Sequence, residues 1–141
     1  KKINVCTKTF QALRIFVNKE TTELIEGIIN ATKILKPGGK IIIISFHSIE
    51  DKIVKFYFSN YSKNKSKPSR YFPEEELKQS LIFFEDYKNK FIRPSEKEIL
   101  DNPPSRSAKL RYIVRNKEKF VDPKKFKNKF QRYVSLERIN D

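Results

Sequence analysis

Hydrophobic residues recur at helical spacing near the start of the chain. Within residues 7–18, Phe10, Leu13 and Val17 stand at positions i, i+3 and i+7, which predicts a helix. A second helix is predicted at about Thr21–Leu35, with its apolar residues on one face. It ends before a Pro-Gly-Gly triplet, which breaks helices. The pattern therefore predicts two consecutive helices followed by a tight turn.

A strand is predicted directly after this turn. Residues 40–46 read KIIIISF, and an unbroken apolar run predicts burial on both faces, as in a parallel sheet covered by helices. Ser48 is predicted to cap the next helix, with Asp51 three residues later in an arrangement close to a capping box. The inner face of that helix contains Ile53 and Phe56.

The later segments have weaker patterns. We expect a loop at 60–70, a short helix at 74–80, a short strand at 81–84, and a loop with one helical turn at 94–107. Residues 108–115 alternate between apolar and mainly basic side chains, which predicts a half-buried strand near the edge of a sheet. The apolar face of that strand holds Leu110, Tyr112 and Val114.

Composition adds a strong positive charge. The 141 residues include 31 Lys and Arg against 17 Asp and Glu, a net charge of +14. Such a field attracts polyanions, so nucleic acid or the ribosome is the expected partner, although codon bias accounts for part of the excess. No segment has the basic amphipathic pattern that favours a membrane surface. The single cysteine excludes an internal disulfide and suits a reducing, cytoplasmic location.

Candidate chemistry lies where the isoleucine strand ends. Ligands bind at this edge of open α/β sheets, and Ser45, Phe46 and His47 stand there. His47 is the candidate catalytic residue, as a base or a hydrogen-bonding group, but it could equally lock the turn. Phe46 either stacks on a nucleobase or fills the core, and core filling is favoured. Ser45 is a better candidate for a ligand contact than Ser48.

Two sets of polar and basic residues could contact phosphates. Lys8 and Arg14, with Gln11 between them, share the polar face of the first helix, where phosphate binding and simple solvation are equal alternatives. The second set enters and lines the last predicted strand, and phosphate contact is favoured for it. Its members are Arg106, Ser107, Lys109 and Arg111.

Other kinds of site lack the residues they need. Gly38-Gly39 predicts only a turn, because three glycines in the whole chain cannot make a phosphate-cradling loop. We therefore expect no cofactor-binding residue in this chain. No Cys/His cluster has metal-binding spacing, and we expect no metal. Residues 102–105, NPPS, imitate the signature of amino-group methyltransferases but lack its aromatic fourth residue, so we interpret them as a rigid turn.

Three blocks of sequence together resemble a known family. They are TKTFQALRIFVNKE at 7–20, LKPGGKIIIISFHSIEDKIVK at 35–55 and NPPSRSAKLRYI at 102–113. In order and separation they resemble the C-terminal half of the MraW/RsmH family, bacterial methyltransferases of a cytosine N4 in small-subunit ribosomal RNA. The resemblance implies an α/β fold, namely the C-terminal part of a Rossmann-like class I methyltransferase sheet with flanking helices.

The resemblance also implies a division of the chain and a function. Residues 1–20 would hold the return helix from a helical insertion, 21–115 the C-terminal half of the methyltransferase domain, and 116–141 a basic tail. The implied reaction is N4-methylation of a cytidine by S-adenosylmethionine, with the cofactor bound mainly upstream of this chain and the small ribosomal subunit as partner. No membrane partner is implied, and a homodimer is left open. The alternative is a non-catalytic, basic RNA-binding or ribosome-associated module.

Overall fold

The computed structural model describes residues 5–63 and 81–138. Most of the loop predicted at 60–70 and all of the helix predicted at 74–80 lie outside the described residues. The elements in chain order are α1 (Val5–Val17), α2 (Glu20–Ile34), β1 (Lys40–Ser45), α3 (Ser48–Asn60), α5 (Glu96–Asp101), the 3-10 helix η2 (Pro103–Ser107), β2 (Lys109–Val114) and α6 (Lys124–Glu137).

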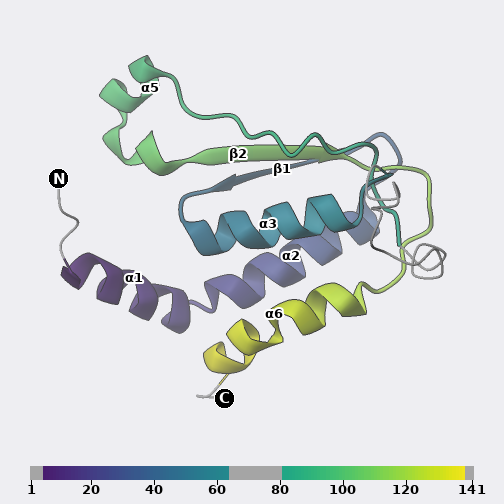
Figure 1. Cartoon of the computed structure of the whole chain (residues 1–141), viewed down its shortest axis with the longest axis horizontal. Coiled ribbons are helices and arrows are strands. Elements are labelled where there is room, and N and C mark those ends of the chain that lie inside the picture. The colour runs from purple at the N-terminus through teal and green to yellow at the C-terminus, as the bar shows by residue number, and fades with distance from the viewer. Residues whose placement is uncertain (1–4, 64–80, 139–141) are drawn as a thin grey trace, which may run out of the picture.

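The described elements form a mixed arrangement of helices and a small sheet. β1 and β2 pair antiparallel, from Lys40 opposite Val114 to Ser45 opposite Lys109. In Figure 1 the strand pair, the helices α2 and α3, and the helix α6 follow one another as layers, with α1 leading into α2. None of the described helices combines the length and apolar character needed to cross a membrane.

The helices predicted from apolar spacing are confirmed, with small shifts at their ends. α2 and α3 begin and end within one or two residues of their predicted limits, and they bury Ile28 and Ile53 as expected. α1 begins earlier than predicted, at Val5, and its apolar stripe faces solvent: Phe10 is 70% exposed and Val17 is 72% exposed. Within this chain, α1 is therefore held mainly by its junction with α2.

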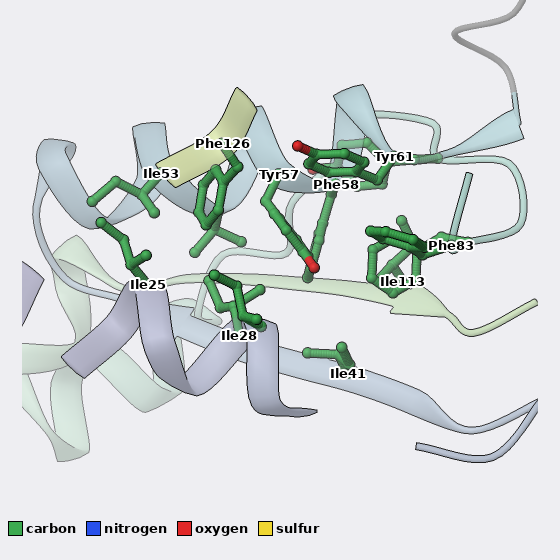
Figure 2. Close-up of a cluster of buried hydrophobic side chains, with 14 of the residues drawn as sticks. Ile25, Ile28, Ile41, Ile53, Tyr57, Phe58, Tyr61, Phe83, Ile113 and Phe126 are labelled. Atoms are coloured by element: carbon green, nitrogen blue, oxygen red, sulfur yellow. The ribbon is translucent and has the colours of Figure 1, made fainter. Parts of the chain in front are cut away.

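An aromatic core joins α3 to α6. Phe126 and Phe130 of α6 are buried, and the ring centre of Phe126 lies 4.6 Å from that of Tyr57. Figure 2 shows Phe126 beside Tyr57 and Ile53 of α3. Because aromatic pairs add about 0.5–1.5 kcal/mol beyond their buried area, this contact makes α6 part of the core. The basic tail predicted at 116–141 did not include this helix.

The faces of both strands differ from the prediction. Ile42 and Ile44 of β1 are 60% and 54% exposed, so the expectation that β1 is covered on both faces is wrong for this chain. β1 pairs with an antiparallel strand rather than parallel ones. In β2 the buried residue between two arginines is Ile113, whereas Tyr112 of the predicted inner face is 52% exposed.

Two buried arginines, Arg111 within β2 and Arg115 directly after it, lie on the same side of the chain as the buried Ile113. The buried face of β2 is therefore the one predicted to be exposed. Arg115 is 5% exposed, and its guanidinium donates to the carbonyl oxygens of Thr32 at 3.2 Å, Phe83 at 2.8 Å and Glu118 at 2.7 Å. A buried charge is tolerated when each of its donors finds an acceptor. The strand predicted at 81–84 is reduced to isolated bridges at Phe84, and the carbonyl oxygen of the neighbouring Phe83 accepts from Arg115.

Candidate functional site at the start of α3

The turn from β1 into α3 is closed by His47 and Glu50. His47 is the N-cap residue, and its Nδ1 accepts from the backbone N–H of Glu50 at 3.4 Å. In return, Oε2 of Glu50 accepts from the N–H groups of Phe46 at 2.8 Å and His47 at 3.2 Å. This is a capping box, one residue before the predicted one. The predicted cap of Ser48 with Asp51 is therefore wrong, and Asp51 is left to face β2.

The imidazole of His47 lies within a charged cluster that links α3 to the α1–α2 junction. Its Nε2 is 3.2 Å from Oε1 of Glu50 and 3.9 Å from Oε2 of Glu20, and Nε of Arg14 is 2.8 Å from Oε1 of Glu20. Because Nδ1 accepts a backbone N–H, Nε2 is the ring nitrogen that faces the carboxylates, and it makes no hydrogen bond among the described residues. The His47 side chain is only 9% exposed. This geometry supports the turn-locking role over that of a free general base.

A second charged cluster joins α3 to β2. Oδ1 of Asp51 accepts from Nε of Arg111 at 2.7 Å, and Oδ2 accepts from Nζ of Lys109 at 3.1 Å. Burial alone would raise the pKa of Asp51, but the hydrogen bonds from Arg111 and Lys109 outweigh it and hold that pKa below its usual value. Arg111 also donates to the hydroxyl of Tyr87 at 2.7 Å, and burial raises the pKa of Tyr87.

The three residues predicted at the strand end have different environments. Ser45 is 2% exposed, and its hydroxyl donates to the carbonyl oxygen of Lys109 at 3.4 Å, so it stabilises the pairing of β1 with β2. Phe46 is 54% exposed, and the favoured expectation that it fills the core is wrong within this chain. An exposed ring at the end of a strand instead leaves its face available to a ligand.

Some of the predicted phosphate-binding residues are exposed to solvent, and others are paired with carboxylates of the protein. Lys8 is exposed on α1 beside the half-buried Gln11, and Arg106 and Ser107 are exposed in η2. Arg14 and Lys109 are both engaged by carboxylates but remain partly exposed. Arg111 is 3% exposed and is satisfied by protein groups, which argues against its contacting phosphate.

Residues from all three blocks of similarity meet at the first turn of α3. The first block supplies Glu20, the second supplies His47, Glu50 and Asp51, and the third supplies Arg111. Of the acidic members, the sequence singles out only Asp51, and as part of a helix cap rather than as a partner of Arg111. Glu20 and Glu50 are not predicted. The one available signal is proximity, because Glu50 and Asp51 follow His47 within four residues.

The residues around His47 bear on whether a metal or a cofactor could be held here. Ligand atoms of Glu20, His47 and Glu50 lie within 4.8 Å of one another, and Nε2 of His47 is buried without a hydrogen-bond partner among the described residues. The Arg14 guanidinium pairs with Glu20, so a cation would compete with Arg14 for that carboxylate. The glycines do not fit an S-adenosylmethionine cradle, because Gly27 lies within α2 and Gly38-Gly39 form the turn before β1.

Comparison with known proteins defines the class to which this fold and this cluster belong. Residues 1–116 match the MraW methylase family, and the chain belongs to that family. It is 50% identical over 113 residues to the protein named ribosomal RNA small subunit methyltransferase H of Ehrlichia chaffeensis, covering 80% of this chain and 34% of that protein.

Relatives from other bacteria have the same name. The protein of Ehrlichia canis is 50% identical over 113 residues, covering 80% of this chain and 35% of that protein. The protein of Bartonella henselae is 45% identical over 127 residues, covering 89% of this chain and 36% of that protein. The chain thus spans about a third of the length of the curated relatives it matches.

Proposed function

We propose that this chain is the substrate-facing part of a cytoplasmic enzyme that transfers a methyl group from S-adenosylmethionine to N4 of a cytidine in small-subunit ribosomal RNA. The family match and the names of the relatives support the reaction class, and the net charge of +14 suits an RNA substrate. Because the glycines here form no cofactor cradle, the proposal assigns cofactor binding to residues outside this chain.

The meeting of the three blocks at the first turn of α3 is the observation that carries the proposal. Charged contacts hold this turn to the α1–α2 junction on one side and to β2 on the other. Phe46 precedes the turn and presents an exposed ring. A site that must align a base needs such a fixed frame, because small displacements of a reacting group cost large factors in rate.

Each residue has a defined role in this proposal. Phe46 stacks on the target cytosine, which must leave its own stack to be reached. His47 is a positioning residue that fixes the turn behind the ring. Lys8 and Arg106 contact phosphates, while Lys109 shares its charge between Asp51 and the RNA. Arg111 acts only by holding Asp51, and Ser45 only by holding β2.

Removing the Phe46 ring is expected to weaken RNA binding and methyl transfer. Stacking of one base on an aromatic side chain is worth about 1–3 kcal/mol, so Phe46→Ala should lose about 5- to 150-fold in affinity, while Phe46→Tyr should retain most of it. Stability should change little, because the ring is 54% exposed. Binding of small-subunit RNA to the complete gene product, followed by mass spectrometry of its nucleosides for N4-methylcytidine, measures both effects.

The same experiment separates the enzyme from the alternative. Formation of N4-methylcytidine by the wild-type protein supports the proposal, and its loss in Phe46→Ala with recovery in Phe46→Tyr supports the role of the ring. RNA binding by the complete gene product without any methyl transfer would favour a non-catalytic RNA-binding module. Methyl transfer by Phe46→Ala at the wild-type rate would show that the ring is not needed and would remove Phe46 from the proposed site.

A further inference from the structure

One flank of α6 has a row of exposed cations that the site at α3 does not use. Lys125, Lys129 and Arg132 are exposed and stand at positions i, i+4 and i+7, which places them on one side of the helix. We call these three residues the α6 stripe. At 1.5 Å per residue the stripe is about 10 Å long, a length that spans about three to four phosphates at roughly 3.4 Å per nucleotide along one strand of a duplex.

The stripe is held in a fixed orientation by the buried face of the helix, which lies about 100° around the helix axis from it. Phe126 and Phe130 are buried in the aromatic core. At the far end, the buried Glu137 accepts from the backbone N–H groups of Thr21 at 3.1 Å and Thr22 at 2.9 Å. In this way Glu137 supplies the acceptor that the start of α2 lacks in its own sequence. The lysines of α6 therefore project from a packed helix rather than from a loose tail.

Local charges leave the stripe uncompensated. Lys127 pairs with Asp122 at 2.7 Å and Arg138 with Glu26 at 3.8 Å. None of the three stripe residues has a carboxylate within ion-pair distance in the part of the chain that the structure describes. Nζ of Lys129 lies over the Phe56 ring, 6.0 Å from its centre. Like charges four residues apart on a helix destabilise it slightly. A row of cations without carboxylate partners favours the binding of a polyanion.

We propose that the α6 stripe is a second RNA-docking surface, which grips the phosphate backbone of the same ribosomal RNA at a distance from the methylated base; this deepens the proposed function and rests on it. Figure 1 shows α6 on the side of α2 and α3 that faces away from the strands. The helix follows residues 1–116, which match the family model.

A membrane surface fits the helix less well than RNA does. A basic amphipathic helix binds anionic lipid by inserting its apolar face, but the apolar face of α6 is already inside the protein: Phe126 is 0% exposed and Phe130 is 1% exposed. Phosphate contacts require only the charged face. The sequence-independent character of such contacts suits a positioning role, while the exposed ring at the end of β1 reads the base.

Neutralising the stripe tests this inference. The variant K125Q/K129Q/R132Q is expected to lose about tenfold in affinity for small-subunit RNA, and the slope of log K against log salt should fall by about 2, or about 0.7 for each lost single-strand phosphate contact. The matched control is K33Q/K36Q/K40Q, which removes the same charge from exposed lysines around the Pro37 turn. Binding of the complete gene product is measured between 50 and 200 mM salt, with anionic vesicles as a second probe.

The outcomes decide between the partners and separate this inference from the proposed reaction. A loss in the stripe variant that clearly exceeds the loss in the control, with unchanged melting temperature, supports the docking surface. Equal losses in both variants would mean that only net charge matters and would overturn it, as would loss of vesicle binding with RNA binding unchanged. Absence of methyl transfer by the wild-type protein would refute the reaction but would leave the salt-slope comparison intact.

Discussion

Truncating Phe126 to alanine is expected to lower the free energy of unfolding by about 4 kcal/mol, within the range of about 3–5 kcal/mol for buried aromatic residues. The ring is fully buried and contacts Phe56, Tyr57 and Phe130. Its removal leaves a cavity at the point where α6 joins α3. Chemical denaturation of the two proteins measures the difference.

The matched control for this truncation is Phe10→Ala. Phe10 is 70% exposed on α1, so its loss should change the free energy of unfolding by less than about 0.5 kcal/mol. Similar effects at both positions would mean that α6 does not pack into the core, and that residues after 116 form the tail predicted from the sequence.

Replacing Asp51 by asparagine is expected to cost about 3 kcal/mol near neutral pH. The change removes the charge that balances Arg111, whose side chain is only 4% exposed, and an unbalanced buried charge costs about 3–5 kcal/mol. Tyr87 remains as a partner, which favours the lower end of that range. Asp86→Asn, at an exposed position, is the control and should be nearly neutral.

The effect of Asp51→Asn should depend on pH in a defined direction. The folded-state pKa of Asp51 is lowered, chiefly by hydrogen bonds from Arg111 and Lys109 working against burial. Its contribution to stability is therefore complete above the unfolded pKa of about 3.9 and declines as pH falls through the lower folded value. The denaturation curves of the two proteins should therefore approach one another as the pH falls through that lower folded value. A difference that is absent at pH 7, or that grows as the pH falls below the unfolded pKa, would contradict the ion pair.

Periodicity alone was enough to predict α1, α2, β1 and α3, because their apolar residues follow helical spacing or form an unbroken run. It failed for α6, where Phe126 and Phe130 are separated by lysines and the charge dominated the interpretation. It also failed for the faces of β2, since Arg111 was counted as a surface residue. The partners that allow burial of that arginine come from distant segments, and no local pattern contains them.

The candidate site was predicted in position but not in its internal arrangement. The end of β1 and the blocks around it were correctly singled out, since Phe46 and His47 follow a recognisable strand. The carboxylates of Glu20 and Asp51 were not identified as partners of the basic residues. Their contacts connect residues far apart in sequence, so only the tertiary fold brings them together.

The central claim is that the exposed ring before α3 faces the RNA base, and photo-crosslinking from that position tests it most directly. A photoreactive phenylalanine analogue is placed at Phe46 or, as control, at Ile34, which is 79% exposed at the end of α2. With small-subunit RNA bound to the complete gene product, we predict crosslinks from position 46 that map beside a single cytidine, and few from position 34. Crosslinks from position 34 that equal or exceed those from position 46 would contradict the account.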